Sequence, residues 1–191
     1  MKFIYMLTSL SLLLLPLSCY ADISHNNSVT VVELLNNFLP NQVKLKKNDK
    51  PIFKLGDFNG DGLEDIVVLF TPQSKPTETK QLKVLTPWVY PTTKKTDKYR
   101  QSLVIFQKTN SQWVSSETQV YALLDTNGVL ETPFFQLLTA SKKDKDYALH
   151  ASMLPIKTKN DLIILPTEAG IDTYVYWDKD TYTLFEPEEM P

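Results

Sequence analysis

The chain has 191 residues, a formal net charge of −2 and a single cysteine, Cys19. The length suits one domain with a real hydrophobic core, and the lone cysteine excludes an internal disulfide framework. Arg100 is the only arginine. Because arginine is the side chain best suited to bidentate phosphate recognition, the composition argues against nucleic acid as a partner.

The N-terminal segment has the pattern of a secretory signal peptide. A lysine at position 2 precedes an apolar run over residues 3–17, which is shorter than the roughly 20 residues that a transmembrane helix needs. The small residues Cys19 and Ala21 then flank Tyr20, so we expect cleavage after Ala21 and no membrane span. The alternative is a bacterial outer-membrane lipoprotein, because Ser18 before Cys19 resembles part of a lipoprotein box and would place a lipid anchor on Cys19. Either route predicts export to the periplasm or to the extracellular surface.

Residues 22–191 would then form the exported part, which we predict to be a single β-rich domain. It begins with one amphipathic helix at about residues 29–39, for which Ser28 or Thr30 can act as N-cap and after which Pro40 follows. Its apolar stripe is typical of a helix that packs on a core. The stripe consists of Val31, Val32, Leu34, Leu35, Phe38 and Leu39.

The loop over residues 57–65 carries oxygen-bearing side chains at alternate positions. Calcium takes about six to eight oxygen ligands in a flexible shell, and a tightly turning loop can wrap around it. Gly60 and Gly62 permit such a turn, and without a cation the carboxylates would repel each other. We therefore predict a Ca²⁺ site with these ligands: Asp57, Asn59, Asp61, the backbone carbonyl of Leu63, and Asp65.

The flanking segments distinguish this loop from an EF-hand. The last position of an EF-hand loop requires a bidentate glutamate, and here that position is Val68. The β-branched and aromatic residues over 66–70 indicate a buried strand, and residues 51–55 predict a short strand before the loop. The loop is therefore expected to join two strands.

The stretch Gly56–Val68 resembles the FG-GAP or VCBS-type repeat, in which a strand–loop–strand unit binds Ca²⁺ in β-propeller blades, as in integrin α-chain heads. The resemblance implies the same five ligands. The chain carries a single good copy, whereas a propeller repeats the unit in every blade. We therefore expect an ion with a mainly structural role, which holds two strands together. An ion-free turn rich in Asp, Asn and Gly is the alternative.

In the middle of the chain, the sequence pattern predicts few helices or strands. Residues 71–101 contain four prolines and many Lys and Thr residues, which indicates a long excursion with one short strand near 81–86. Residues 102–107 and 112–120 are rich in β-formers and are separated by four polar residues, so we predict that they form a hairpin.

The C-terminal third continues the two-residue periodicity of strands. A Thr-Pro pair before residues 134–140 fits the start of a short helix, with a strand as the alternative. Strands are predicted at 147–153, 161–165, 171–177 and 182–185, the last closing a hairpin. We therefore predict a mainly β fold of antiparallel sheets with one N-terminal helix. An α+β fold is the alternative.

Residues that could support catalysis are scarce. His25 and His150 are the only histidines, and the sequence has neither a His/Cys cluster for zinc nor a Gly-rich phosphate loop. The best alternative site is the turn that holds Glu168 and Asp172, where paired carboxylates could hydrolyse a glycan. Aromatic residues that could stack on a sugar follow that turn: Tyr174, Tyr176 and Trp177. A polar turn with ordinary hairpin aromatics is the simpler interpretation, so we predict no catalytic residues.

The sequence thus predicts an exported calcium-binding module whose ion is mainly structural and whose partner is an unidentified protein or glycan. A periplasmic hydrolase using Glu168 and Asp172 is one alternative. The other is an envelope lipoprotein or inhibitor that acts by protein–protein interaction.

Overall fold

The computed structural model describes residues 30–43, 51–85, 102–110, 112–124, 135–140, 145–166 and 172–187. The predicted signal peptide, which contains Cys19, lies outside these ranges, and so do His25 and Glu168.

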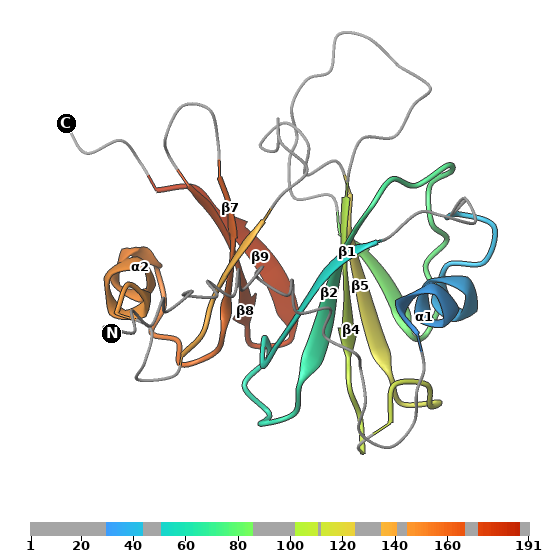
Figure 1. Cartoon of the computed structure of the whole chain (residues 1–191), viewed down its shortest axis with the longest axis horizontal. Coiled ribbons are helices and arrows are strands. Elements are labelled where there is room, and N and C mark those ends of the chain that lie inside the picture. Colours follow the sequence, from blue (N-terminus) through green and yellow to red (C-terminus); the bar gives the residue numbers. More distant parts are fainter. Residues whose placement is uncertain are drawn as a thin grey trace, which may run out of the picture.

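The described chain is mainly β, as predicted, with two sheets and two short helices (Figure 1). The first sheet has the order β1-β2-β4-β5-β3, and its strands are β1 (Ile52–Gly56), β2 (Asp65–Phe70), β3 (Leu82–Leu85), β4 (Ser102–Gln107) and β5 (Gln119–Leu123). The second sheet has the order β6-β7-β8-β9, and its strands are β6 (Gln136–Leu138), β7 (Leu162–Leu165), β8 (Thr173–Asp178) and β9 (Thr181–Phe185). Neighbouring strands are antiparallel, except that β3 runs parallel to β5.

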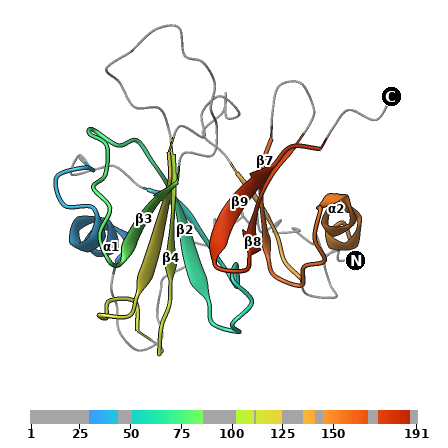
Figure 2. The same cartoon turned by 180° about the vertical axis from the view of Figure 1, so that it is seen from behind.

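The two sheets pack face to face, and each carries a helix on its outer face (Figures 1 and 2). Helix α1 (Val31–Phe38) covers the first sheet and α2 (Tyr147–Met153) covers the second. Strand β2 illustrates the consequence, because Val67 faces the core between the sheets while Ile66 and Val68 face α1. Every residue of β2 and of β4 is buried, which explains the unbroken apolar runs over residues 66–70 and 103–106.

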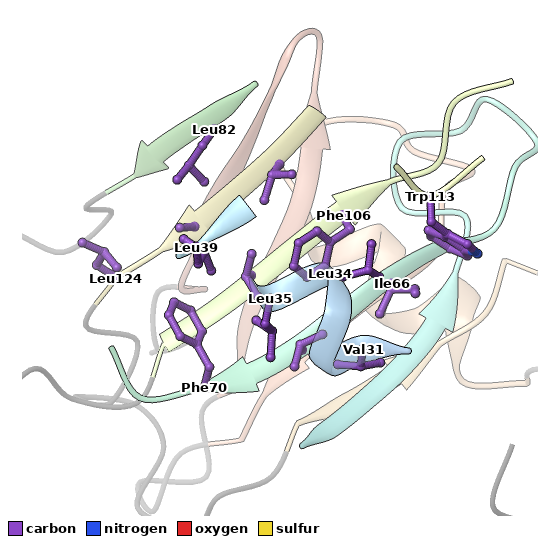
Figure 3. Packing of buried hydrophobic residues seen from close by; sticks show 14 residues of the cluster. Val31, Leu34, Leu35, Leu39, Ile66, Phe70, Leu82, Phe106, Trp113 and Leu124 are labelled. Atoms are coloured by element: carbon purple, nitrogen blue, oxygen red, sulfur yellow. The ribbon is translucent and has the colours of Figure 1, made fainter. Parts of the chain in front are cut away.

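Helix α1 is fixed at its start by a capping box. Thr30 Oγ1 accepts the N–H of Glu33 at 3.2 Å, and Glu33 Oε2 accepts the N–H of Thr30 at 2.7 Å. Leu34 and Leu35 are fully buried and point onto the sheet beside Phe106 (Figure 3). The predicted N-terminal helix is therefore confirmed, with Thr30 as its N-cap.

The prediction of a strand at 147–153 is wrong, because these residues form α2. Tyr147, Ala151 and Leu154 recur at helical spacing and pack on the outer face of the second sheet. The segment is also rich in Ala, Leu and Met, which are strong helix formers. A stretch this short fits both the two-residue period of a strand and the roughly 3.6-residue period of a helix. The helix is favoured because it packs on the apolar outer face of the second sheet.

The predicted hairpin of strands 102–107 and 112–120 is correct in pairing but wrong in extent. Strands β4 and β5 pair antiparallel, yet β5 begins only at Gln119. Before it, Thr118 Oγ1 accepts the N–H of Ser115 at 3.0 Å, and Trp113 is buried in the core beneath α1. These contacts hold the intervening residues in turns rather than in a strand.

The other expected strands that the structure describes are present. Strands β1 and β2 flank the acidic loop, and β3 lies within the predicted 81–86 segment. Strands β7, β8 and β9 match the three predicted near the C-terminus, and β8 and β9 form the expected hairpin. Of the two alternatives for 134–140, the strand holds as β6.

Candidate metal centre

The acidic loop joins β1 to β2 at the lower edge of the sandwich in Figure 1. Gly60 and Gly62 adopt φ angles of 80° and 81°, which L side chains rarely adopt. Asp57 closes the turn, since its Oδ1 accepts the N–H of Gly60 at 2.8 Å and its Oδ2 accepts the N–H of Gly62 at 3.0 Å. The backbone of the turn therefore favours glycine at both predicted positions.

The next two predicted ligands fold back on the loop in the same way. Asn59 Oδ1 accepts the N–H of Asp61 at 3.1 Å, and Asp61 Oδ1 accepts the N–H of Leu63 at 2.7 Å. Asn59 Nδ2 also donates to Asp61 Oδ2 at 2.9 Å. A carboxylate oxygen has more than one lone pair, so an oxygen that accepts one N–H can still coordinate a cation.

Asp65 ends the loop as the first residue of β2 and is fully buried. Its Oδ2 accepts the N–H of Phe58 at 3.2 Å, and its Oδ1 accepts the N–H of Lys108 at 3.1 Å. Burial is the main cause that raises the pKa of Asp65 from 3.8 to about 8. The like charges of Asp61 and Asp57 also raise this pKa, while the two hydrogen bonds lower it. The site therefore favours either a bound cation or a proton on Asp65.

The loop also contacts the start of β7 through Asp161, which no pattern in the sequence indicated. Asp161 Oδ2 accepts the N–H of Asp57 at 3.0 Å, and the N–H of Asp161 donates to the Asp57 carbonyl at 2.9 Å. The other oxygen, Oδ1, accepts the N–H of Ala140, just after β6, at 2.6 Å. Asp57 and Asp161 are 104 positions apart, so the spacing of residues gave no sign of the contact.

Asn160 brings the second sheet close to the glycines of the loop. A Cβ atom added at Gly60 would collide with Oδ1 of Asn160, and one added at Gly56 would lie 2.8 Å from Oδ2 of Asp161. Phe58, at the start of the loop, is 1% exposed and packs in the core between the sheets. The loop is thus docked between the two sheets.

The donor chemistry of the loop fits calcium, because the predicted ligands are all hard oxygen donors. In the part of the chain that the structure describes, no three Asp, Glu, His or Cys side chains are arranged to hold a metal ion. The carboxylates of Asp57, Asp61 and Asp65 are instead directed to backbone N–H groups. An ion would have to share these oxygens with the backbone or replace some of the N–H donors.

The alternative site is only partly described. Glu168 lies outside the described residues, while Asp172 is half-buried just before β8. Tyr174 and Tyr176 are buried beneath α2, so they cannot stack on a sugar at the surface. Nδ1 of His150, in α2, lies 2.7 Å from the Tyr174 hydroxyl, and burial together with Asp172 raises the pKa of Tyr174.

Among the described residues, no helix is long and apolar enough to cross a membrane. Comparison of the chain with models of protein families, with curated proteins and with solved structures found no match. The resemblance of Gly56–Val68 to FG-GAP and VCBS repeats therefore stays a prediction.

Proposed function

We propose that this protein is an exported calcium-binding module in which the ion has a mainly structural role. The observation that carries the proposal is the arrangement of the loop: Asp57, Asn59 and Asp61 fold over a turn that ends in the fully buried carboxyl of Asp65. A buried carboxyl group beside others of like charge is costly unless a cation or a proton compensates it. Calcium, with its preference for several oxygen ligands, suits this donor set.

The proposed ligands are the side chains of Asp57, Asn59, Asp61 and Asp65 together with the carbonyl of Leu63. When bound, the ion would supply positive charge that offsets the repulsion among the carboxylates. Residues of the loop itself set the shape of its backbone. Gly60 and Gly62 allow the tight turn, and Asp57 holds it through the N–H groups of both. In this arrangement the loop fixes the connection from β1 to β2, as in an FG-GAP-type strand–loop–strand unit.

The proposal includes export, which rests on the apolar run over residues 3–17 and the small residues up to Ala21. Outer compartments contain millimolar calcium, which matches extracellular modules with dissociation constants of roughly 10⁻⁴ to 10⁻³ M. The partner would be a protein or glycan bound by a surface that the calcium loop holds in one shape. A lipid on Cys19 would add a membrane anchor.

Calorimetric titration of the metal-free protein with Ca²⁺ and with Mg²⁺ tests the proposal. We expect calcium-selective binding that is lost in Asp61→Ala, because Asp61 would contribute a charged ligand. Glu64→Gln is the matched control: Glu64 lies in the same loop, is exposed and is not a proposed ligand, so calcium binding should persist. Equal calcium binding by the wild type and Asp61→Ala would refute the ligand assignment.

A further inference from the structure

Asp161 holds the acidic loop and the second sheet with the two oxygens of one carboxyl group. Oδ2 accepts the N–H of Asp57 in the loop, and Oδ1 accepts the N–H of Ala140 beyond β6. The backbone N–H of Asp161 donates to the carbonyl of the same Asp57 at 2.9 Å. Both polar backbone groups of the first proposed ligand are therefore fixed by one residue, which directly precedes β7 of the second sheet.

Only a side chain with two acceptor oxygens can make both of these contacts. An asparagine at position 161 would present one oxygen and one NH₂ group, and the NH₂ group would face a backbone N–H. The approach is also close, because the Oδ2 atom of Asp161 would lie 2.8 Å from a Cβ atom added at Gly56. Asn160 Nδ2 lies 3.5 Å from the carbonyl of Phe58 and adds a weaker contact to the same loop. The backbone of the loop is thus shaped from outside as well as by its own turns.

We propose that Asp161 is a positioning residue for the acidic loop and that it couples calcium binding to the packing of the second sheet on the first. The coupling presupposes the calcium binding proposed above. Asp161 acts on the site through the backbone of Asp57 and is not itself a ligand. If the loop is held in place before the ion arrives, binding costs less ordering of the chain. The coupling must be reciprocal, so a bound ion would also strengthen the contact between Asp161 and Ala140.

Calcium titration of the metal-free Asp161→Asn variant tests the positioning role. Loss of an outer partner of a metal ligand typically weakens metal affinity by about 10- to 100-fold, and we expect a loss in that range. Glu186→Gln is the control, because Glu186 is exposed after β9 and the substitution removes the same charge from the second sheet. At about 1 M salt, where the Debye length is about 3 Å, the difference should persist because it does not arise from long-range charge.

A role that is only structural would give a different result. Asp161→Asn would then unfold more easily in EDTA but would bind calcium with unchanged affinity, and this outcome would overturn the proposal. If Asp161 positions the backbone of the loop, Asp161→Asn should lower both the stability in EDTA and the affinity for calcium.

Hydrogen exchange at the Ala140 amide tests the coupling in the wild-type chain and does not depend on whether the variant folds. Ala140 lies outside the acidic loop, so we expect calcium to slow its exchange about as much as it slows exchange at the Asp57 amide. If calcium binds and protects Asp57 but leaves Ala140 unchanged, the coupling is refuted while the calcium site stands. If the wild type does not bind calcium at all, the proposed function fails and the coupling fails with it.

Discussion

Asp65 shows how a single buried carboxyl group links folding to pH. Its pKa is raised from 3.8 to about 8, mainly by burial and further by Asp61 and Asp57, so the folded chain holds this proton more tightly than the unfolded chain does. A carboxyl group of this kind stabilises the folded state at low pH. Its contribution is fully present below the pKa of the unfolded chain and is lost as the pH rises through the folded-state value.

We therefore predict that the free energy of unfolding in EDTA falls between pH 3.8 and about pH 8 through the contribution of Asp65. Asp65→Asn removes the titrating group, so this part of the slope should disappear even if the variant is less stable at every pH. Urea denaturation at a series of pH values measures the slope. The same slope in the wild type and in Asp65→Asn would contradict the assignment. Calcium should flatten the wild-type slope, because metal binding favours the deprotonated carboxylate.

Gly60 and Gly62 have the same backbone conformation but different surroundings, so they can be compared directly. Both have positive φ angles, so alanine at either position should cost about 1–2 kcal/mol through backbone strain. Only at Gly60 would the new Cβ also collide, with the side chain of Asn160, while nothing lies within 4 Å at Gly62. We predict that Gly60→Ala lowers the free energy of unfolding more than Gly62→Ala does.

Removing the colliding side chain tests whether docking causes that difference. In the Asn160→Ala background, the two glycine variants should become nearly equal in chemical denaturation. If the gap between them persisted in that background, contact between the loop and the second sheet would not be its cause.

At the scale of elements, α1 depends on a few fully buried side chains. Leu34 is fully buried between the helix and the first sheet (Figure 3). Leu34→Ala should cost about 2–5 kcal/mol, since it removes buried methyl groups and leaves a cavity. Val32, on the same helix, is 37% exposed, and Val32→Ala should stay within about 0.5 kcal/mol of the wild type. Denaturation of both variants measures the contrast, and comparable losses would show that α1 does not pack on the sheet as described.

The elements also show what local sequence signals can and cannot predict. Helix α1 was predictable because its capping residue, its apolar spacing and the following Pro40 all agree. Helix α2 was not predicted, because its short segment fits the strand and helix periods equally. Its Ala, Leu and Met residues favour a helix, and the apolar outer face of the second sheet stabilises it. Strand β5 was misplaced because the burial of Trp113 holds the preceding residues in turns, which is a tertiary effect.

At the scale of the whole molecule, helix, sheet, sheet and helix stack so that both faces of both sheets are covered (Figures 1 and 2). The antiparallel β character was evident from alternation and from runs such as 66–70. The stacking of the two sheets was not, because it depends on contacts between distant segments. The acidic loop was recognisable from local spacing, whereas Asp161 and Asn160 reach it only through the fold. Local spacing thus located the loop, and the residues that contact it from the second sheet come from the topology.

The most direct test of calcium binding is a thermal melt of residues 22–191 in EDTA, in millimolar Ca²⁺ and in millimolar Mg²⁺. An ion that binds only the folded state stabilises it by about 1.4 kcal/mol at ten times its dissociation constant, which is the most that about 1 mM calcium gives at a dissociation constant of roughly 10⁻⁴ M. We predict a rise in melting temperature that is selective for calcium and absent in Asp61→Ala. Equal melting temperatures in all three conditions would mean that the hydrogen bonds of the loop suffice without an ion, and the proposed function would be wrong.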